Sequence, residues 1–205
     1  VLTLWQGLGY YSRARNLHAA AKMVMDKFNG VFPSEYKDVL SLKGVGEYTA
    51  AAIVSFSYNQ PYAVVDGNVY RVLSRIFAVN TPINTGHGQK VFKELAQALI
   101  DENSPGLHNQ AIMEFGALQC VPASPDCAIC PVSSICMAYA EKNVSSYPVK
   151  KGKQKTRERY FNYFDIRQGE NMYLHKRIKK DIWQNLYELP LIETEEELSV
   201  DGLGE

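Results

Sequence analysis

A tight turn followed by a helix is encoded by Leu42-Lys43-Gly44-Val45-Gly46-Glu47-Tyr48-Thr49-Ala50-Ala51-Ala52. Gly44 and Gly46 tolerate the backbone conformations of a tight hairpin, and the residues after them have high helix propensity. The hairpin lacks large side chains, so its amide groups and the start of the next helix can approach an anion such as a phosphate. An ordinary turn between two helices is the alternative interpretation.

The hairpin lies within a longer stretch of helical periodicity that extends to residue 140. Apolar residues recur at helical spacing in three stripes, which we expect to be core faces: Leu17, Ala21, Val24 and Phe28; Val69, Val72, Leu73 and Ile76; Val91, Phe92, Leu95 and Leu99. Residues 1–140 are therefore predicted to form an all-α domain. A chain of 205 residues with 46% hydrophobic and 21% charged residues is ordinary for a globular protein with one full domain and a partial one.

The four cysteines of the chain are gathered in one short segment, at Cys120, Cys127, Cys130 and Cys136. Four thiolates suit either a tetrahedral zinc ion or an iron–sulfur cluster. A structural zinc site usually has two short hooks, and only Cys127 and Cys130 form one here, which favours iron and sulfur. Disulfides are the alternative. Nothing at the N-terminus is typical of a targeting segment, so we expect reduced thiols in a cytoplasmic protein, associated with the nucleoid if it is bacterial.

Charge gives no evidence for a polyanionic partner, because 22 basic residues balance 22 acidic residues. Any site for nucleic acid must be local. No apolar run approaches the ~20 residues that cross a bilayer, so we expect no membrane association. We also expect a monomer.

Asp66 lies between the apolar segment Tyr62-Ala63-Val64-Val65 and a predicted helix that begins at Gly67. Its simplest role is that of an N-cap. The helix dipole and the amide donors of a first turn keep such a carboxylate ionised. An anion held in this way can stabilise positive charge that develops on a sugar.

The pattern changes after the cysteine segment. Residues 141–159 are polar and basic and are predicted to be a solvated linker. Residues 160–167 and 172–178 are predicted strands on either side of a turn. Two strands and one helix do not form a stable core, so we expect residues 160–205 to be a partial domain. Val1 lies within an apolar helical phrase, so we expect truncation at both ends.

Five segments together resemble the helix-hairpin-helix DNA glycosylases: Gly7–Leu17, the hairpin at 42–52, Val65–Val69, Asn109–Ala111 and the cysteine run. Gly7-Leu8-Gly9-Tyr10-Tyr11 and the appended second domain are most similar to the adenine DNA glycosylase (MutY) family, which removes adenine mispaired with 8-oxoguanine. The resemblance implies a mostly α fold, in which a helix-hairpin-helix core with an iron–sulfur loop precedes the start of a nudix-like α+β domain.

The resemblance implies roles for individual residues. Asp66 corresponds to the aspartate that stabilises the oxocarbenium-like sugar, with Asn68 and Tyr48 as its active-site neighbours. Tyr10 corresponds to an aromatic wedge inserted beside 8-oxoguanine, although a core tyrosine is the alternative. Gln110 corresponds to the residue that hydrogen-bonds the extruded adenine; a surface polar residue is the alternative.

The implied partner is double-stranded DNA that contains an adenine:8-oxoguanine mispair, and the implied cofactor is a [4Fe-4S] cluster held by the four cysteines. The residues expected to lie along the DNA backbone are Arg13, Arg15, Lys43, Gly44, Val45 and Gly46. Lys43 is expected to face phosphate or solvent.

One position separates two reaction types within the resembled superfamily. Bifunctional members resembling endonuclease III carry a lysine that attacks the sugar, where this chain has Tyr48. A phenol cannot form an imine, so we expect hydrolysis without strand cleavage. The family's general-acid glutamate precedes the Gly7 segment, and none of the six residues before Gly7 is acidic, so we expect residues 1–205 alone to be inactive. Glu47 is expected to be a surface charge.

The C-terminal phrase Trp183-Gln184-Asn185-Leu186-Tyr187-Glu188-Leu189-Pro190 resembles part of the nudix-like domain that inspects the lesion strand. Asn185 stands where glycine is commoner, but asparagine also tolerates a positive φ. Two alternatives remain: a mismatch thymine glycosylase, and a non-catalytic iron–sulfur DNA-binding module.

Overall fold

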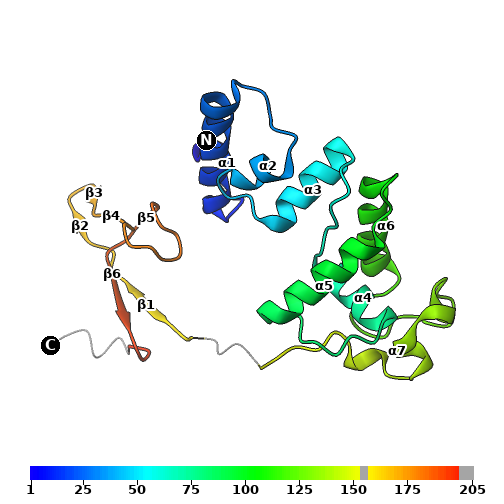
Figure 1. The fold of residues 1–205 in the computed structure, drawn as a ribbon. Helices are drawn as coiled ribbons and strands as arrows, with labels where there is room; N and C mark the ends of the chain where they lie inside the picture. The colour runs from blue at the N-terminus through cyan, green and yellow to red at the C-terminus, as the bar shows by residue number, and fades with distance from the viewer. Residues whose placement is uncertain (153–156, 199–205) are drawn as a thin grey trace. The chain divides into compact units, whose positions relative to one another are not determined.

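The computed structural model describes residues 1–152 and 157–198 (Figure 1). The chain divides into two compact units, a first unit of Val1–Gly152 and a second unit of Lys153–Glu205. Within the described residues, no helix has the length and apolar character that crossing a bilayer requires.

The described elements of the first unit are all helical, as predicted. They are η1 (Thr3–Trp5), α1 (Tyr11–Phe28), α2 (Tyr36–Ser41), α3 (Glu47–Tyr58), α4 (Gly67–Ile76), α5 (Gly86–Leu99), α6 (Pro105–Leu118), η2 (Ser133–Ile135), α7 (Met137–Ala140) and η3 (Val144–Ser146). Individual residues fix where two of these helices begin. Thr85 caps α5 by accepting a hydrogen bond from Gly88 N at 3.0 Å, and Pro105 is the first residue of α6.

Two apolar clusters form the core of the first unit. One joins α4 to α5 through Val69, Leu73, Phe92 and Ala96, and the other joins α2 to α3 through Val39, Ala50 and Val54. The predicted stripe of α4 is therefore confirmed as a core face. The stripe predicted on α1 is wrong, because Leu17 is 59% exposed and Ala14 is the buried residue of this helix. Periodicity alone does not show which of two adjacent faces meets a neighbouring helix.

Part of the expected linker packs against the first unit. Tyr147 is buried, Ile83 N donates to Val149 O at 3.0 Å, and Asn84 exchanges two hydrogen bonds of 2.8 and 2.9 Å with the backbone of Lys151. The polar composition of residues 141–152 therefore does not make this stretch a solvated linker.

The described strands of the second unit form three antiparallel pairs. β1 (Tyr160–Tyr163) pairs with β6 (Leu191–Thr194), β2 (Arg167–Gln168) with β3 (Asn171–Met172), and β4 (His175–Lys176) with β5 (Tyr187–Glu188). The predicted turn at 168–171 is present, but the long strand predicted for 160–167 is broken. The longest ladder instead joins β1 to a strand about 30 residues later, and residues 157–198 include no helix.

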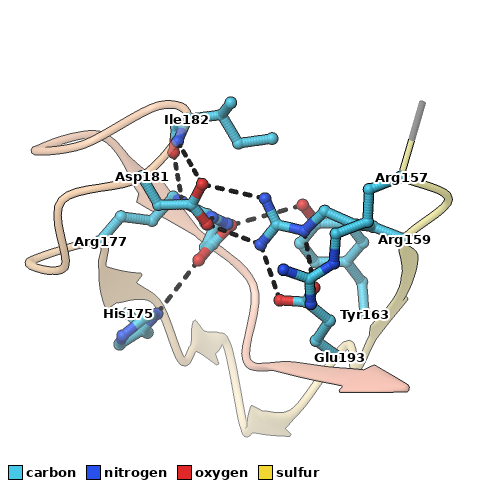
Figure 2. A network of polar contacts seen from close by, with 9 residues as sticks. Arg157, Arg159, Tyr163, His175, Arg177, Asp181, Ile182 and Glu193 are labelled. Carbon is cyan, nitrogen blue, oxygen red and sulfur yellow. Dashed lines mark hydrogen bonds and ion pairs between the residues drawn. The ribbon is translucent and has the colours of Figure 1, made fainter. Parts of the chain in front are cut away.

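Ion pairs join the strands and loops of the second unit (Figure 2). Arg159 donates to both oxygens of Asp181 and to both oxygens of Glu193, at 2.6 to 2.9 Å. Arg177, at 8% exposure, is the one buried residue among residues 157–198, and it donates to Glu188 at 2.6 Å and to Asp181 at 3.3 Å. The buried residue of this unit is therefore a charged one, whereas the core of the first unit is formed by apolar side chains.

Candidate active site

The side chain of Asp66 caps α4, as predicted. Its Oδ1 accepts a hydrogen bond from Val69 N at 2.8 Å, and its Oδ2 accepts one from the Asn68 amide at 2.9 Å. Both oxygens therefore have donors, and the helix N-terminus adds positive potential. The carboxylate is partly buried and fixed in orientation.

Asn68 is in turn held by an arginine that the sequence did not single out. Arg71 Nη2 donates to Asn68 Oδ1 at 2.8 Å and to Gly116 O at 2.6 Å, while Nε donates to Cys120 O at 2.7 Å. Burial lowers the pKa of the Arg71 guanidinium, but an arginine remains charged. Hydrogen bonds thus run without a break from Asp66 to the cysteine loop.

α6 approaches Asn68 closely because residue 116 is a glycine. A Cβ placed on Gly116 would lie 2.7 Å from Asn68 Cβ and 3.2 Å from its backbone. Any larger residue would displace either α6 or the first turn of α4.

The hairpin between α2 and α3 turns at Gly44, whose φ is +80°. A Cβ at Gly44 would lie 2.5 Å from the Asn16 side chain of α1, so the turn requires glycine for conformation and for space. Gly46 has an ordinary extended backbone and caps α3 without a side-chain hydrogen bond. Gly44, Gly46, Lys43 and Arg13 are exposed, whereas Val45 and Arg15 are half-buried.

Tyr48 is 49% exposed and lines a pocket whose lining residues do not include Asp66. Tyr36 and Tyr62, which stack with ring centroids 4.3 Å apart, line the same pocket. Glu47 pairs with Lys93 of α5 at 3.0 Å, as expected of a surface charge. The described contacts therefore do not bring Tyr48 to the capped carboxylate.

Tyr10 and Gln110 are both exposed to solvent. Tyr10 is 80% exposed and has a φ of 45°, which excludes the core-tyrosine interpretation. Gln110, on α6, donates to Glu114 at 2.6 Å. The backbone of Tyr10 is in the left-handed region and its ring is exposed. Both features favour a role for this ring in contacting another molecule.

The four cysteines are free thiols and line one pocket. Burial, and then the charges of the other three thiols, raise the pKa of the Cys127 thiol. Four ionised thiolates here would require positive charge at their centre. Among the described residues, no group of three or more His, Cys, Asp or Glu is placed to hold one metal ion. Four thiols that line one pocket are a donor set that suits either an iron–sulfur cluster or a zinc ion.

Arg75 connects the cysteine pocket to α4. It is 2% exposed, and it donates to Cys120 Sγ at 3.3 Å, Val121 O at 2.8 Å, Pro122 O at 3.0 Å and Val144 O at 3.2 Å. The guanidinium therefore donates to one thiol of the pocket and also satisfies the carbonyls of the loop.

Comparison with known proteins shows which families the chain resembles. A family model described as "HhH-GPD superfamily base excision DNA repair protein" matches residues 1–101. The chain is 34% identical over 197 residues to an adenine DNA glycosylase of Buchnera aphidicola subsp. Acyrthosiphon pisum, covering 96% of this chain and 56% of the relative. It is 38% identical over 208 residues to the Arabidopsis thaliana adenine DNA glycosylase, covering 95% of this chain and 33% of that relative. The chain thus spans about half the length of the first relative and a third of the second.

Two solved structures are similar to the chain. A thermostable thymine-DNA glycosylase gives a TM-score of 0.58 at 33% identity, over 63% of this chain and 59% of that one. Endonuclease III in a non-covalent complex with DNA gives 0.56 at 28% identity, over 66% and 61%.

Proposed function

Because the chain belongs to the HhH-GPD superfamily of base excision DNA repair proteins, we propose that it forms the excising part of an adenine DNA glycosylase. The observation that carries this proposal is the carboxylate of Asp66, which a backbone N–H and the Asn68 amide hold in place at the start of α4. The substrate is adenine paired with 8-oxoguanine, or with guanine, in duplex DNA.

In the proposed reaction, water hydrolyses the bond between adenine N9 and the sugar C1′. The base takes up a proton from a general acid and leaves with the bonding electrons, and the sugar develops oxocarbenium character that the Asp66 anion stabilises. The oxygen of water then bonds to C1′ and loses a proton, so the products are adenine and an abasic strand. Tyr48 has no amine, so no Schiff base and no strand cleavage arise from this position.

Two exposed surfaces supply the proposed DNA contacts. The hairpin at Lys43–Gly46 presents its amides and the start of α3 to a phosphate, and the exposed Arg13 and the half-buried Arg15 of α1 extend this surface. Tyr10 unstacks the duplex beside the lesion, which helps the opposite adenine to leave the helix. Gln110 exchanges its hydrogen bond with Glu114 for one with adenine.

Cys120, Cys127, Cys130 and Cys136 would hold a [4Fe-4S] cluster, and Arg75 would offset its negative charge. The cluster supplies structural order to the loop that follows α6. Residues 160–198 are proposed to begin a nudix-like domain that inspects the lesion strand.

Thymine excision from a mismatch is the second candidate, because a thymine-DNA glycosylase is among the similar solved structures. The full-length protein, incubated with adenine:8-oxoguanine and guanine:thymine duplexes, distinguishes the two. We expect release of free adenine and an abasic strand that breaks only after alkali treatment. Preferential release of thymine, or strand breakage without alkali, would contradict the proposal.

A further inference from the structure

The segment that leads into Asp66 belongs to neither a helix nor a sheet, yet side chains satisfy its backbone. On one side is Gln97 of α5. Its amide nitrogen donates to Pro61 O at 2.7 Å, and its amide oxygen accepts from Ala63 N at 3.1 Å. One side chain therefore makes the paired contacts that a neighbouring strand would make.

Asn109 of α6 makes an equivalent pair of hydrogen bonds with the backbone of Tyr62 and Val64. Its amide nitrogen donates to Tyr62 O at 2.9 Å, and its oxygen accepts from Val64 N at 3.0 Å. The same nitrogen also donates to Ser55 Oγ of α3 at 2.9 Å. Asn109 is 1% exposed, so all of its hydrogen-bonding groups have partners inside the protein.

We infer that Gln97 and Asn109 form an amide clamp that positions the carboxylate of Asp66 for catalysis. The clamp fixes four consecutive residues, Pro61–Val64, and α4 fixes the carboxylate from the other side through Val69 N. Asp66 is thus held between two supports that come from different helices. This inference rests on the proposed function.

The chemistry of the clamp requires primary amides. Each backbone pair offers one C=O acceptor and one N–H donor, so a partner must both donate and accept. A carboxylate would accept from the N–H group but would repel the carbonyl. An apolar side chain of similar length, such as that of methionine, would fill the space and make neither bond.

Gln97 is the better position for the test, because it is exposed whereas Asn109 is buried. Gln97→Ala and Gln97→Met in the full-length protein both remove the two bonds, and Gln97→Met keeps most of the volume. Glu94→Ala is the matched control: Glu94 is exposed on the same helix, and its partner is Lys90 at 3.9 Å.

Three quantities are measured for each variant. They are the single-turnover rate of adenine excision at saturating enzyme, the Kd for a duplex with 2′-fluoro-2′-deoxyadenosine opposite 8-oxoguanine, and the Tm. We expect both Gln97 variants to lose ~10-fold or more in rate, since small misplacements of reacting groups have effects of this size, with Kd and Tm close to those of Glu94→Ala.

Two results would overturn the clamp: excision rates equal to that of Glu94→Ala, or a joint loss of rate, affinity and Tm, which would indicate support of the fold alone. Asp66→Asn, measured in parallel, separates this failure from failure of the proposed function. If Asp66→Asn loses excision while the Gln97 variants do not, only the clamp is wrong. If Asp66→Asn excises adenine at the parental rate, the proposed function itself fails.

Discussion

The two units of this chain achieve order by different means. The first unit buries two apolar clusters, and its buried arginines, Arg71 and Arg75, bond mainly to backbone carbonyls. These contacts are short, lie inside the protein and are poorly accessible to salt. A site that needs fixed geometry, such as the Asp66 cap, lies in this unit.

The described part of the second unit has no buried apolar side chain, and Arg177 takes the central position. Arg159 and Arg177 also lie over the ring of Phe161, at 4.7 and 5.8 Å from its centroid. Figure 2 shows these arginines paired with carboxylates, so we expect order here to depend on ionised carboxylates. The comparison predicts that the second unit responds to pH and salt under conditions that leave the first unit unchanged.

The largest expected effect comes from removing the buried cation of the first unit. Arg75→Met leaves the carbonyls of Val121, Pro122 and Val144 without their donor. We therefore expect the free energy of unfolding to fall by about 3 kcal/mol or more. Helical circular dichroism during urea unfolding measures this loss, because the described helices all belong to the first unit. An unchanged unfolding midpoint would show that the guanidinium is not needed to order the cysteine loop.

Acid is expected to affect the second unit first. Hydrogen bonds from Arg159 lower the pKa of Asp181 and of Glu193 below their usual values. Because the folded pKa values are lowered, the stabilisation is present above the unfolded values of about 4 and is lost as pH falls below them. Fluorescence of Trp183 in a Trp5→Phe background follows this unit. Helical signal lost before the Trp183 change would contradict the comparison.

Salt is expected to have a smaller effect in the same direction. Raising ionic strength from about 0.1 M to about 1 M shortens the screening length from ~10 Å to ~3 Å, which weakens the partly exposed Arg159 pairs. Arg159→Gln should remove most of this salt sensitivity from the Trp183 signal. Equal salt responses of the parent and the variant would show that the network does not order this unit.

Much of the geometry of the candidate site could be predicted because its signals are local. Asp66 precedes a helix by the spacing of an N-cap, and Gly44 marks a turn that only a glycine adopts easily. The cysteines are close in sequence, so their common pocket follows from short loops. Each of these features depends on residues that lie close together in the sequence.

The residues that support the site could not be predicted in this way. Arg71, Arg75 and Asn109 are polar residues on helices, which usually face solvent, and their burial depends on carbonyls or amides roughly 45 to 70 residues away. The pairing of β1 with β6 is equally non-local. A sequence pattern indicates whether a segment forms a helix or a strand, but it does not show which other element that segment packs against.

The central claim is that a fixed negative charge at the start of α4 drives excision. Asp66→Asn in the full-length protein tests it most directly, because the asparagine oxygen can still accept from Val69 N while the charge is lost. Single-turnover excision of adenine opposite 8-oxoguanine should fall by roughly 10²-fold or more, with an unchanged Tm. Excision at the parental rate by this variant would contradict the account.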